Sequence, residues 1–164
     1  MSSEWPLYFR DNLTLGDRDH PAAICCLWMK QTRLAESIPA SSYGILGNLY
    51  SRDGLNYLLR NILARPTVRA IVLCGPDLTR SGAALVNLSR RGVDEQHRVR
   101  GAALAESGTA DAAEIDVEIP PGVLEEFRAN VQVIDLRGVN DPAQIHAKLE
   151  ELQTALPRGA WAAP

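Results

Sequence analysis

Residues 51–82 read SRDGLNYLLRNILARPTVRAIVLCGPDLTRSG, and this stretch decides which fold class the sequence predicts. Its first part predicts a helix, because aliphatic residues recur along one helical face at Leu55, Leu58, Leu59, Ile62 and Leu63. Ser51 suits the N-cap of this helix, and Pro66 follows its end. Residues 68–74 (VRAIVLC) then form an apolar run typical of a strand buried on both faces of a parallel sheet. A helix followed by a buried strand is the repeating unit of an α/β fold.

Strands and helices alternate on both sides of this unit as well. Residues 22–28 (AAICCLW) are a second apolar run and predict another buried strand. The other expected elements are strands at residues 43–49, 97–102 and 131–136, and helices at residues 81–92, 120–127 and 141–156. This alternation predicts a small Rossmann-like α/β domain with three layers and a mostly parallel sheet.

The length of 164 residues is typical of one domain. We expect a single domain at residues 1–156, followed by a flexible tail or linker at residues 157–164. Residues 103–113 are small and acidic without a period, which predicts a mobile surface loop.

The composition argues against several classes of function. The formal net charge is −3, so no overall positive field exists and nucleic acid is not an expected partner. No apolar run approaches the roughly 20 residues that a membrane span needs, and no signal peptide is visible. We therefore expect a cytoplasmic protein without a membrane segment.

The cysteines and histidines do not predict a metal site. Cys25, Cys26 and Cys74 lie in the expected strands, where free thiols act as small apolar side chains. The three histidines are scattered, and none stands at zinc-ligand spacing from a Cys or another His. No nucleophile is visibly paired with a base either, since Ser41 and Ser42 have no His nearby in the sequence. The sequence thus predicts no metal ligand and no catalytic residue.

Ligands of a parallel sheet bind outside the carboxyl ends of its strands, which singles out the loop at residues 75–82. This loop links a buried strand to a helix N-terminus, where backbone N–H groups can receive an anion. It has neither the glycine pattern of a phosphate loop nor that of a dinucleotide site. In an alternative that the spacing leaves equally open, Asp77 or Ser81 merely caps the helix. The candidate binding residues here are Gly75, Pro76, Asp77, Arg80, Ser81 and Gly82.

The loop at residues 47–53 also precedes a helix. Tyr50 suits stacking on a flat ring and Asn48 suits hydrogen bonding to its edge, but an ordinary turn with a Ser51 cap explains the same residues. The candidate residues here are Gly47, Asn48, Tyr50 and Ser51. We expect the two loops to converge on one pocket at the carboxyl ends of neighbouring strands.

Several segments, in order, resemble MtrA, the corrinoid-binding subunit of tetrahydromethanopterin S-methyltransferase. The similarity covers roughly residues 5–150 and is closest at residues 61–69 (NILARPTVR) leading into residues 72–75 (VLCG). Further matching segments are residues 5–6 (WP), 15–17 (LGD), 21–25 (PAAIC), 81–82 (SG), 92–94 (GVD), 101–102 (GA), 126–128 (EFR) and 133–136 (VIDL).

The resemblance implies a cobamide cofactor and one-carbon chemistry. In this family the loop after the strand that corresponds to residues 68–74 supplies a His that ligates cobalt. Residues 75–82 contain no His, and His20 and His97 lie outside this loop. This departure puts the cobalt chemistry in doubt, although loop contacts alone can still hold a cobamide.

Three hypotheses follow from the resemblance. The first is a corrinoid- or one-carbon-cofactor-binding module, such as a methyltransferase component, that serves a catalytic one-carbon partner protein. The second is an accessory domain that binds a pterin or a nucleotide, or that docks onto a one-carbon enzyme such as a thymidylate-synthase-like protein. A self-sufficient transferase has the least support, because no catalytic group can be named.

Overall fold

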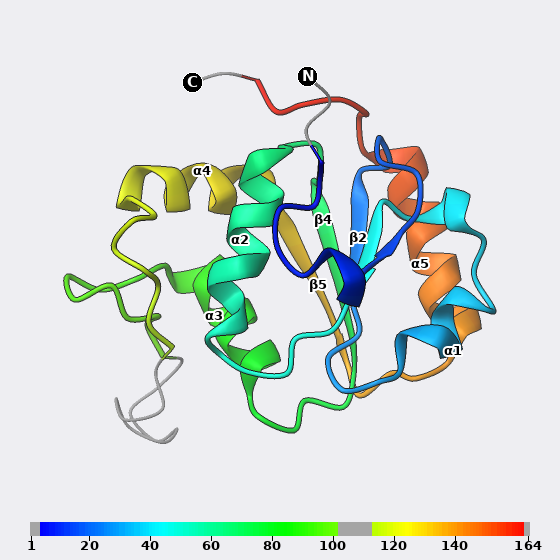
Figure 1. Ribbon diagram of the computed structural model, residues 1–164, viewed down its shortest axis with the longest axis horizontal. Helices are drawn as coiled ribbons and strands as arrows, with labels where there is room; N and C mark the ends of the chain where they lie inside the picture. The colour runs from blue at the N-terminus through cyan, green and yellow to red at the C-terminus, as the bar shows by residue number, and fades with distance from the viewer. Residues whose placement is uncertain (1–3, 102–112, 163–164) are drawn as a thin grey trace.

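The computed structural model describes residues 4–101 and 113–162. Its five strands form one sheet in the order β1-β3-β2-β4-β5 (Figure 1). Strands β2 (Ala22–Cys25), β3 (Ile45–Gly47), β4 (Ala70–Gly75) and β5 (Gln132–Arg137) are parallel, and the short β1 (Thr14–Leu15) pairs with β3 in the antiparallel sense. The α/β class and the mostly parallel sheet that the sequence predicts are confirmed.

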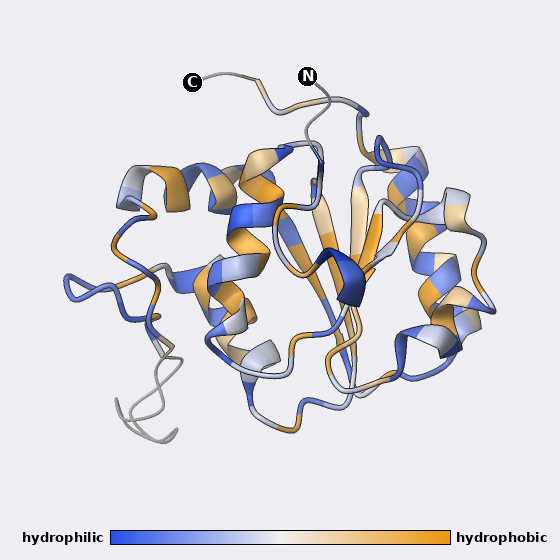
Figure 2. Cartoon of the chain, viewed as in Figure 1, coloured by the Kyte–Doolittle hydropathy of each residue, from blue (hydrophilic) through white to orange (hydrophobic). Residues whose placement is uncertain are grey.

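Helices cover both faces of this sheet. In Figure 1, α2 (Gly54–Ala64), α3 (Ser81–Arg91) and α4 (Pro121–Asn130) lie on one side, and α1 (Gln31–Ala35) and α5 (Pro142–Ala155) lie on the other. Figure 2 shows apolar residues on the central strands and on the helix sides that face them, with polar residues toward the outside. The chain is therefore built in three layers.

Two apolar cores explain why the central strands read as unbroken apolar runs. Neighbouring residues of a strand point to opposite faces, and both faces of β2 and β4 are covered. Ala23, Cys25, Ile71 and Leu73 pack under α2 and α3, whereas Ala22, Ile24, Val72 and Cys74 pack on the side of α5. Burial raises the pKa of the Cys25 and Cys26 thiols to about 12, so both stay neutral at physiological pH.

The strand predicted at residues 97–102 is wrong. The described part of this segment makes isolated β-bridges instead of a strand. The Asp94 carboxylate accepts hydrogen bonds from the N–H groups of Gln96 and Arg98, and His97 has a φ of 62°, so the backbone turns where a strand would extend. The loop predicted at residues 103–113 lies almost entirely outside the described residues.

Two short elements, α1 and β1, were not predicted. Helix α1 has five residues and buries only Leu34 among them, so it carries no apolar periodicity. Strand β1 has two residues, and its place is set by pairing with β3 rather than by its own pattern. Elements this short give no signal that separates them from a polar loop.

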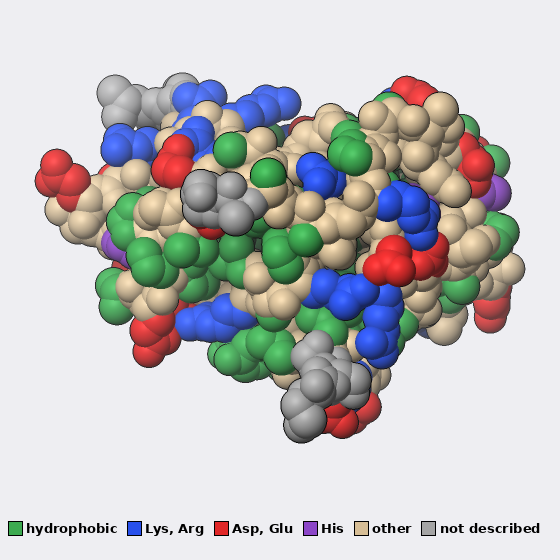
Figure 3. Space-filling model, turned by 90° about the horizontal axis from the view of Figure 1, so that it is seen from above, with side chains coloured by type: hydrophobic (Ala, Val, Ile, Leu, Met, Phe, Trp, Pro, Cys, Tyr) green, Lys and Arg blue, Asp and Glu red, His purple; other side chains and the backbone are tan. Residues whose placement is uncertain are grey.

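The C-terminal residues 158–161 lie against the chain near the start of β4. Trp161 donates hydrogen bonds from its backbone N to Pro66 O and from Nε1 to Val68 O, both at 2.8 Å. Figure 3 views the molecule from the side of the two termini, and its Lys and Arg side chains are interspersed with Asp and Glu. The division into a domain at residues 1–156 and a flexible tail stays a prediction.

Candidate functional site

The loops that follow β2, β3 and β4 meet at one edge of the sheet, the carboxyl edge, at the bottom of Figure 1. Strand β2 lies between β3 and β4, so the expectation that the two candidate loops follow neighbouring strands is wrong. The chain leaves β2 toward one face of the sheet and leaves β3 and β4 toward the other (Figure 1). Such a reversal opens a crevice at the carboxyl ends of parallel strands, which is where their ligands bind.

The two candidate loops nevertheless touch each other across this edge. The Ser81 hydroxyl donates a hydrogen bond to Leu49 O at 2.6 Å, and the Thr79 hydroxyl donates one to Tyr50 O at 2.8 Å. Ser81 is fully buried, so its hydroxyl fastens the loops together instead of facing a ligand.

The N-terminus of α3 is already occupied by a side chain of the same loop. Asp77 accepts hydrogen bonds from Gly82 N and Ala83 N, both at 2.9 Å, which is the capping role that the sequence left open as an alternative. A Cβ at Gly82 would lie 3.0 Å from the Asp77 carboxylate and 3.0 Å from Leu27. Gly82 therefore permits close packing within the protein, and the first N–H groups of α3 are not free for an anion.

Other residues of this loop shape its path. Gly75 has a φ of 80°, and a Cβ there would meet the backbone of Cys26. Pro76 accepts a hydrogen bond from Trp28 N at 3.3 Å, which joins this loop to the one after β2. Arg80 has a φ of 63° and is exposed, so of the candidate residues in this loop it reaches furthest into solvent.

In the loop after β3, Asn48 has a structural role. Its Nδ2 donates hydrogen bonds to Leu27 O at 2.9 Å and Met29 O at 2.6 Å, and its Oδ1 accepts one from Gln31 Nε2 at 2.8 Å. The Ser51 hydroxyl accepts a hydrogen bond from Gly54 N at 3.3 Å, as the capping interpretation expects. Neither side chain is left free to read a ligand.

Tyr50 belongs to an exposed aromatic pair. It is 51% exposed, and its ring lies edge to face against Trp28 with the centroids 4.7 Å apart. Trp28 is 39% exposed although the sequence placed it in a buried strand, because β2 ends at Cys25 and Leu27 turns the chain with a φ of 49°. Trp28 is not among the candidate residues from the sequence, and its position at the carboxyl end of an apolar run was the available signal. Large exposed aromatic rings at a crevice indicate a binding surface.

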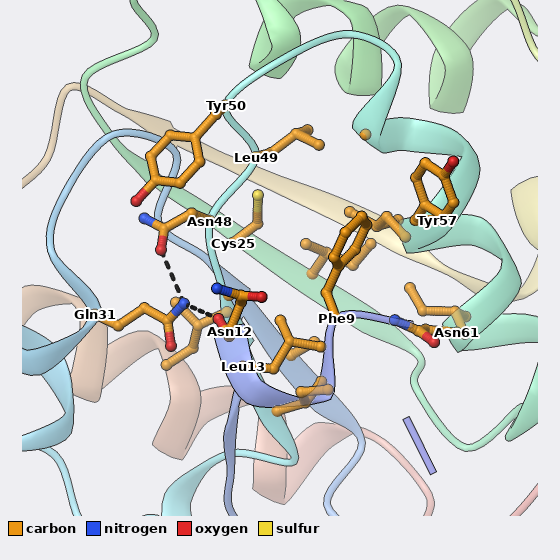
Figure 4. Close-up of a pocket in the computed structure, with 18 of the residues that line it drawn as sticks. Phe9, Asn12, Leu13, Cys25, Gln31, Asn48, Leu49, Tyr50, Tyr57 and Asn61 are labelled. Carbon is orange, nitrogen blue, oxygen red and sulfur yellow. Dashed lines mark hydrogen bonds between the residues drawn. The ribbon is translucent and has the colours of Figure 1, made fainter. Parts of the chain in front are cut away.

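A cavity of about 730 Å³ opens beside this pair, between β3, α2 and the N-terminal segment (Figure 4). We name residues 5–15 the strap, because they run across the side of β3 and α2. The strap is tied at one end by Asn61, which accepts hydrogen bonds from Leu7 N and Tyr8 N at 2.8 and 2.9 Å. At the other end Gln31 binds Asn12 O and the Thr14 hydroxyl. Gly47 lies under the strap, where a Cβ would meet Leu13.

Ser42 does have a histidine nearby, which corrects the expectation from the sequence. His146 Nε2 lies 3.3 Å from the Ser42 hydroxyl and 3.1 Å from Glu150 Oε1. Both partners face the same ring nitrogen, whereas activation of a nucleophile requires the orienting carboxylate on the other one. The cluster therefore joins α5 to the turn before β3 and does not form a nucleophile–base pair.

The described residues contain no group of three or more His, Cys, Asp or Glu side chains placed to hold a metal ion. The three histidines also lie away from the crevice. His20 is buried before β2, where its Nδ1 accepts a hydrogen bond from Ala22 N, and His97 Nδ1 lies 3.3 Å from Ile115 O. His146 is on α5 beside Ser42.

Within residues 4–101 and 113–162, no helix combines the length and the apolar character that crossing a membrane requires.

Comparisons with known proteins agree on one family. The family model for MtrA, the A subunit of tetrahydromethanopterin S-methyltransferase, matches residues 1–163. The chain is 28% identical over 155 residues to one such protein of Methanothermobacter thermautotrophicus, the second A subunit of its tetrahydromethanopterin S-methyltransferase, covering 92% of this chain and 79% of the relative. It is 26% identical over 155 residues to the first A subunit of the same enzyme in Methanobrevibacter ruminantium, covering 92% of this chain and 58% of that relative. The A subunit of the enzyme in Methanosphaera stadtmanae is 22% identical over 150 residues, covering 90% of this chain and 56% of that relative.

Proposed function

The chain belongs to the MtrA family of tetrahydromethanopterin S-methyltransferase subunits, and from this membership we propose that it is a corrinoid-binding component of a methyltransferase. In this proposal the corrinoid lies on the carboxyl edge of the sheet and is held without a protein ligand to cobalt. A partner protein performs the catalytic step, because the described residues of this chain form no nucleophile–base pair of their own.

The exposed Trp28–Tyr50 pair is the observation that carries the proposal. A corrin is a broad flat ring, and it gains most from a surface that offers large aromatic faces without needing a deep cavity. Leu78 is 67% exposed in the loop after β4, which the Thr79 hydroxyl ties to Tyr50, so it extends the same apolar surface. Covering these side chains removes apolar area from water and stabilises the complex.

The candidate residues take two kinds of role in this proposal. Tyr50, Pro76 and Arg80 are at least partly exposed and are proposed to contact the corrinoid. The others hold the two loops in place through the contacts described above: Gly47, Asn48, Ser51, Gly75, Asp77, Ser81 and Gly82.

The residues present do not fit a histidine-ligated cobalt. The sequence has three histidines, all three are described, and each lies in another part of the fold. The cysteines nearest the edge are no substitute, because a thiolate is the ligand form and burial keeps Cys25 and Cys26 neutral. No step through cobalt is therefore assigned to this chain.

The test is reconstitution of the purified chain with hydroxocobalamin followed by gel filtration. We expect the corrinoid to be retained, and we expect a Trp28→Ala, Tyr50→Ala double variant to weaken its binding at least about tenfold, as expected when two stacking contacts are lost. Tyr8→Ala is the matched control, because Tyr8 is 38% exposed and stacks on Tyr57 away from the crevice. Failure of the unmodified chain to retain corrinoid, or equal retention by the double variant, would refute the proposal.

A further inference from the structure

The cavity under the strap has a floor without charge. Sheet residues Ala23, Cys25 and Ile71 and helix residues Leu58 and Ile62 line it. Its volume of about 730 Å³ falls within the roughly 300–1,000 Å³ that is usual for small-molecule sites. An apolar floor of this kind rejects an ionised group, because burying an unpaired charge is costly.

Most amide side chains around the cavity already have partners inside the protein. Asn48 and Gln31 bond to each other and to backbone or side-chain groups, and Asn61 bonds to the strap. The Asn12 carboxamide differs, since it makes no hydrogen bond with any described residue although Asn12 lines the cavity. Its backbone is fixed by hydrogen bonds to Phe9 O and from Gln31, so the free amide is held at a set place in the wall.

Figure 4 shows Asn12 in the view between Gln31 on one side and Phe9 on the other. A carboxamide offers one acceptor and two donors side by side. The matching partner is a group with an adjacent acceptor and donor, which is the edge of an amide or a lactam. This match does not depend on any charge.

Aromatic rings flank the opening of the cavity. Phe9 and Tyr57 lie edge to face with their centroids 4.9 Å apart, and they are 57% and 37% exposed. Phe9 has a φ of 57°, a conformation that a non-glycine residue adopts at an energetic cost, and this backbone holds its ring at the opening. Lys30 and Asp53 at the lining have opposite charges, so the opening selects neither a cation nor an anion.

We propose that this cavity is a second binding site, for a flat and uncharged molecule that carries an amide or lactam edge. The floor takes the ring, Phe9 and Tyr57 cover it, and Asn12 pairs with the lactam edge. This site does not rest on the corrinoid proposal, because it uses the strap and α2 and is tested without a corrinoid.

The experiment titrates the full chain with 2-quinolone, a flat bicyclic lactam, and in parallel with naphthalene, which has a similar shape and no polar edge. Binding is followed by calorimetry and by the fluorescence of Trp5, which lines the cavity. We expect saturable binding of 2-quinolone. Asn12→Leu should weaken it about two- to tenfold, the usual net effect of losing neutral hydrogen bonds, and should leave naphthalene binding unchanged.

Two further variants separate this site from a general apolar effect. Tyr57→Leu should weaken both ligands, because it removes an aromatic wall. Asn87→Leu on α3 is the control for Asn12→Leu, since Asn87 does not line the cavity, and it should change neither affinity. The proposal is overturned if the folded chain shows no saturable 2-quinolone binding, or if Asn12→Leu binds 2-quinolone as well as the unmodified chain does. If 2-quinolone binds as expected while hydroxocobalamin is not retained, the corrinoid proposal fails and this one stands.

Discussion

Asn61→Ala should detach the strap while leaving the sheet folded. The Asn61 side chain accepts hydrogen bonds from Leu7 N and Tyr8 N and donates one to Tyr8 O, at 2.8, 2.9 and 3.1 Å. Each such bond contributes about 0.5–1.5 kcal/mol net, so losing three lowers the free energy of unfolding by about 2–4 kcal/mol. That is a substantial part of the roughly 5–15 kcal/mol that holds a domain of this kind together.

The assay is urea unfolding combined with amide hydrogen exchange. We expect the N–H groups of Leu7 and Tyr8 to lose protection in the variant, whereas the amides of β2 and β4 keep theirs. The control is Asn130→Ala, since Asn130 donates to Glu126 O within α4 and anchors no distant segment. It should cost less than about 1 kcal/mol. If Asn61→Ala changes the free energy of unfolding by no more than about 0.5 kcal/mol, or if the strap amides stay protected, Asn61 does not anchor the strap.

Three other predictions concern packing, pH and metal content. Gly82→Ala should destabilise the fold by about 1–3 kcal/mol in urea unfolding, because the new Cβ crowds Asp77 and Leu27, whereas Gly122→Ala on α4, with nothing within 4 Å, should cost nothing; equal effects would contradict the packing role. Burial lowers the pKa of His20 below its ordinary 6.5, so the unfolded chain binds a proton that the folded chain does not, and stability should fall as the pH drops below 6.5. His20→Asn should flatten this dependence between about pH 7.5 and 5.5, and an unchanged slope would assign it to other groups. Finally, the chain purified without added corrinoid should be colourless and carry no stoichiometric zinc or iron by metal analysis, and one tightly held ion per chain would contradict this.

The elements with strong periodicity could be predicted from the sequence. The helix face that begins at Leu55 and the apolar runs at residues 22–28 and 68–74 correspond to α2, β2 and β4. Their signal is strong because each element buries a full face or two faces, and burial fixes the residue type at every repeat. Where burial is slight, as in α1 and β1, the sequence carries no comparable signal.

The order of the strands could not be predicted in the same way. Periodicity shows that a strand is buried but not which strand lies beside it, so β3 and β4 were expected as neighbours when β2 separates them. The contact between the two loops was nevertheless expected correctly, and Ser81 makes it with Leu49, 32 residues away in the chain. Such a bond depends on the full topology and leaves no mark in local spacing.

The candidate residues show why a polar side chain near a helix start is a weak sign of a ligand site. Asp77, Ser51 and Asn48 each have an interpretation as a cap or turn, and in each case the structure shows this use. The reason is general, since an unsatisfied N–H or carbonyl at a helix or strand end is unfavourable when buried, and a nearby side chain of the same protein is the most available partner. A side chain that remains free in such surroundings, as the Asn12 carboxamide does among the described residues, is therefore more informative than several that are paired.

Trp28 shows how a binding surface arises from a departure from the local rule. Continuation of β2 through residues 22–28 would have buried Trp28, but the chain turns at Leu27 with a φ of 49°, a conformation that costs a non-glycine residue about 1–2 kcal/mol. Asn48 offsets this cost by donating hydrogen bonds to Leu27 O and Met29 O, and the buried Leu27 side chain fixes the turn from below. The turn is thus maintained by the surrounding structure, and its effect is to place an indole beside Tyr50 at the edge of the sheet where ligands bind. Strain that the rest of the fold maintains is expected where function requires it, which is a physical reason to assign the corrinoid surface to this edge.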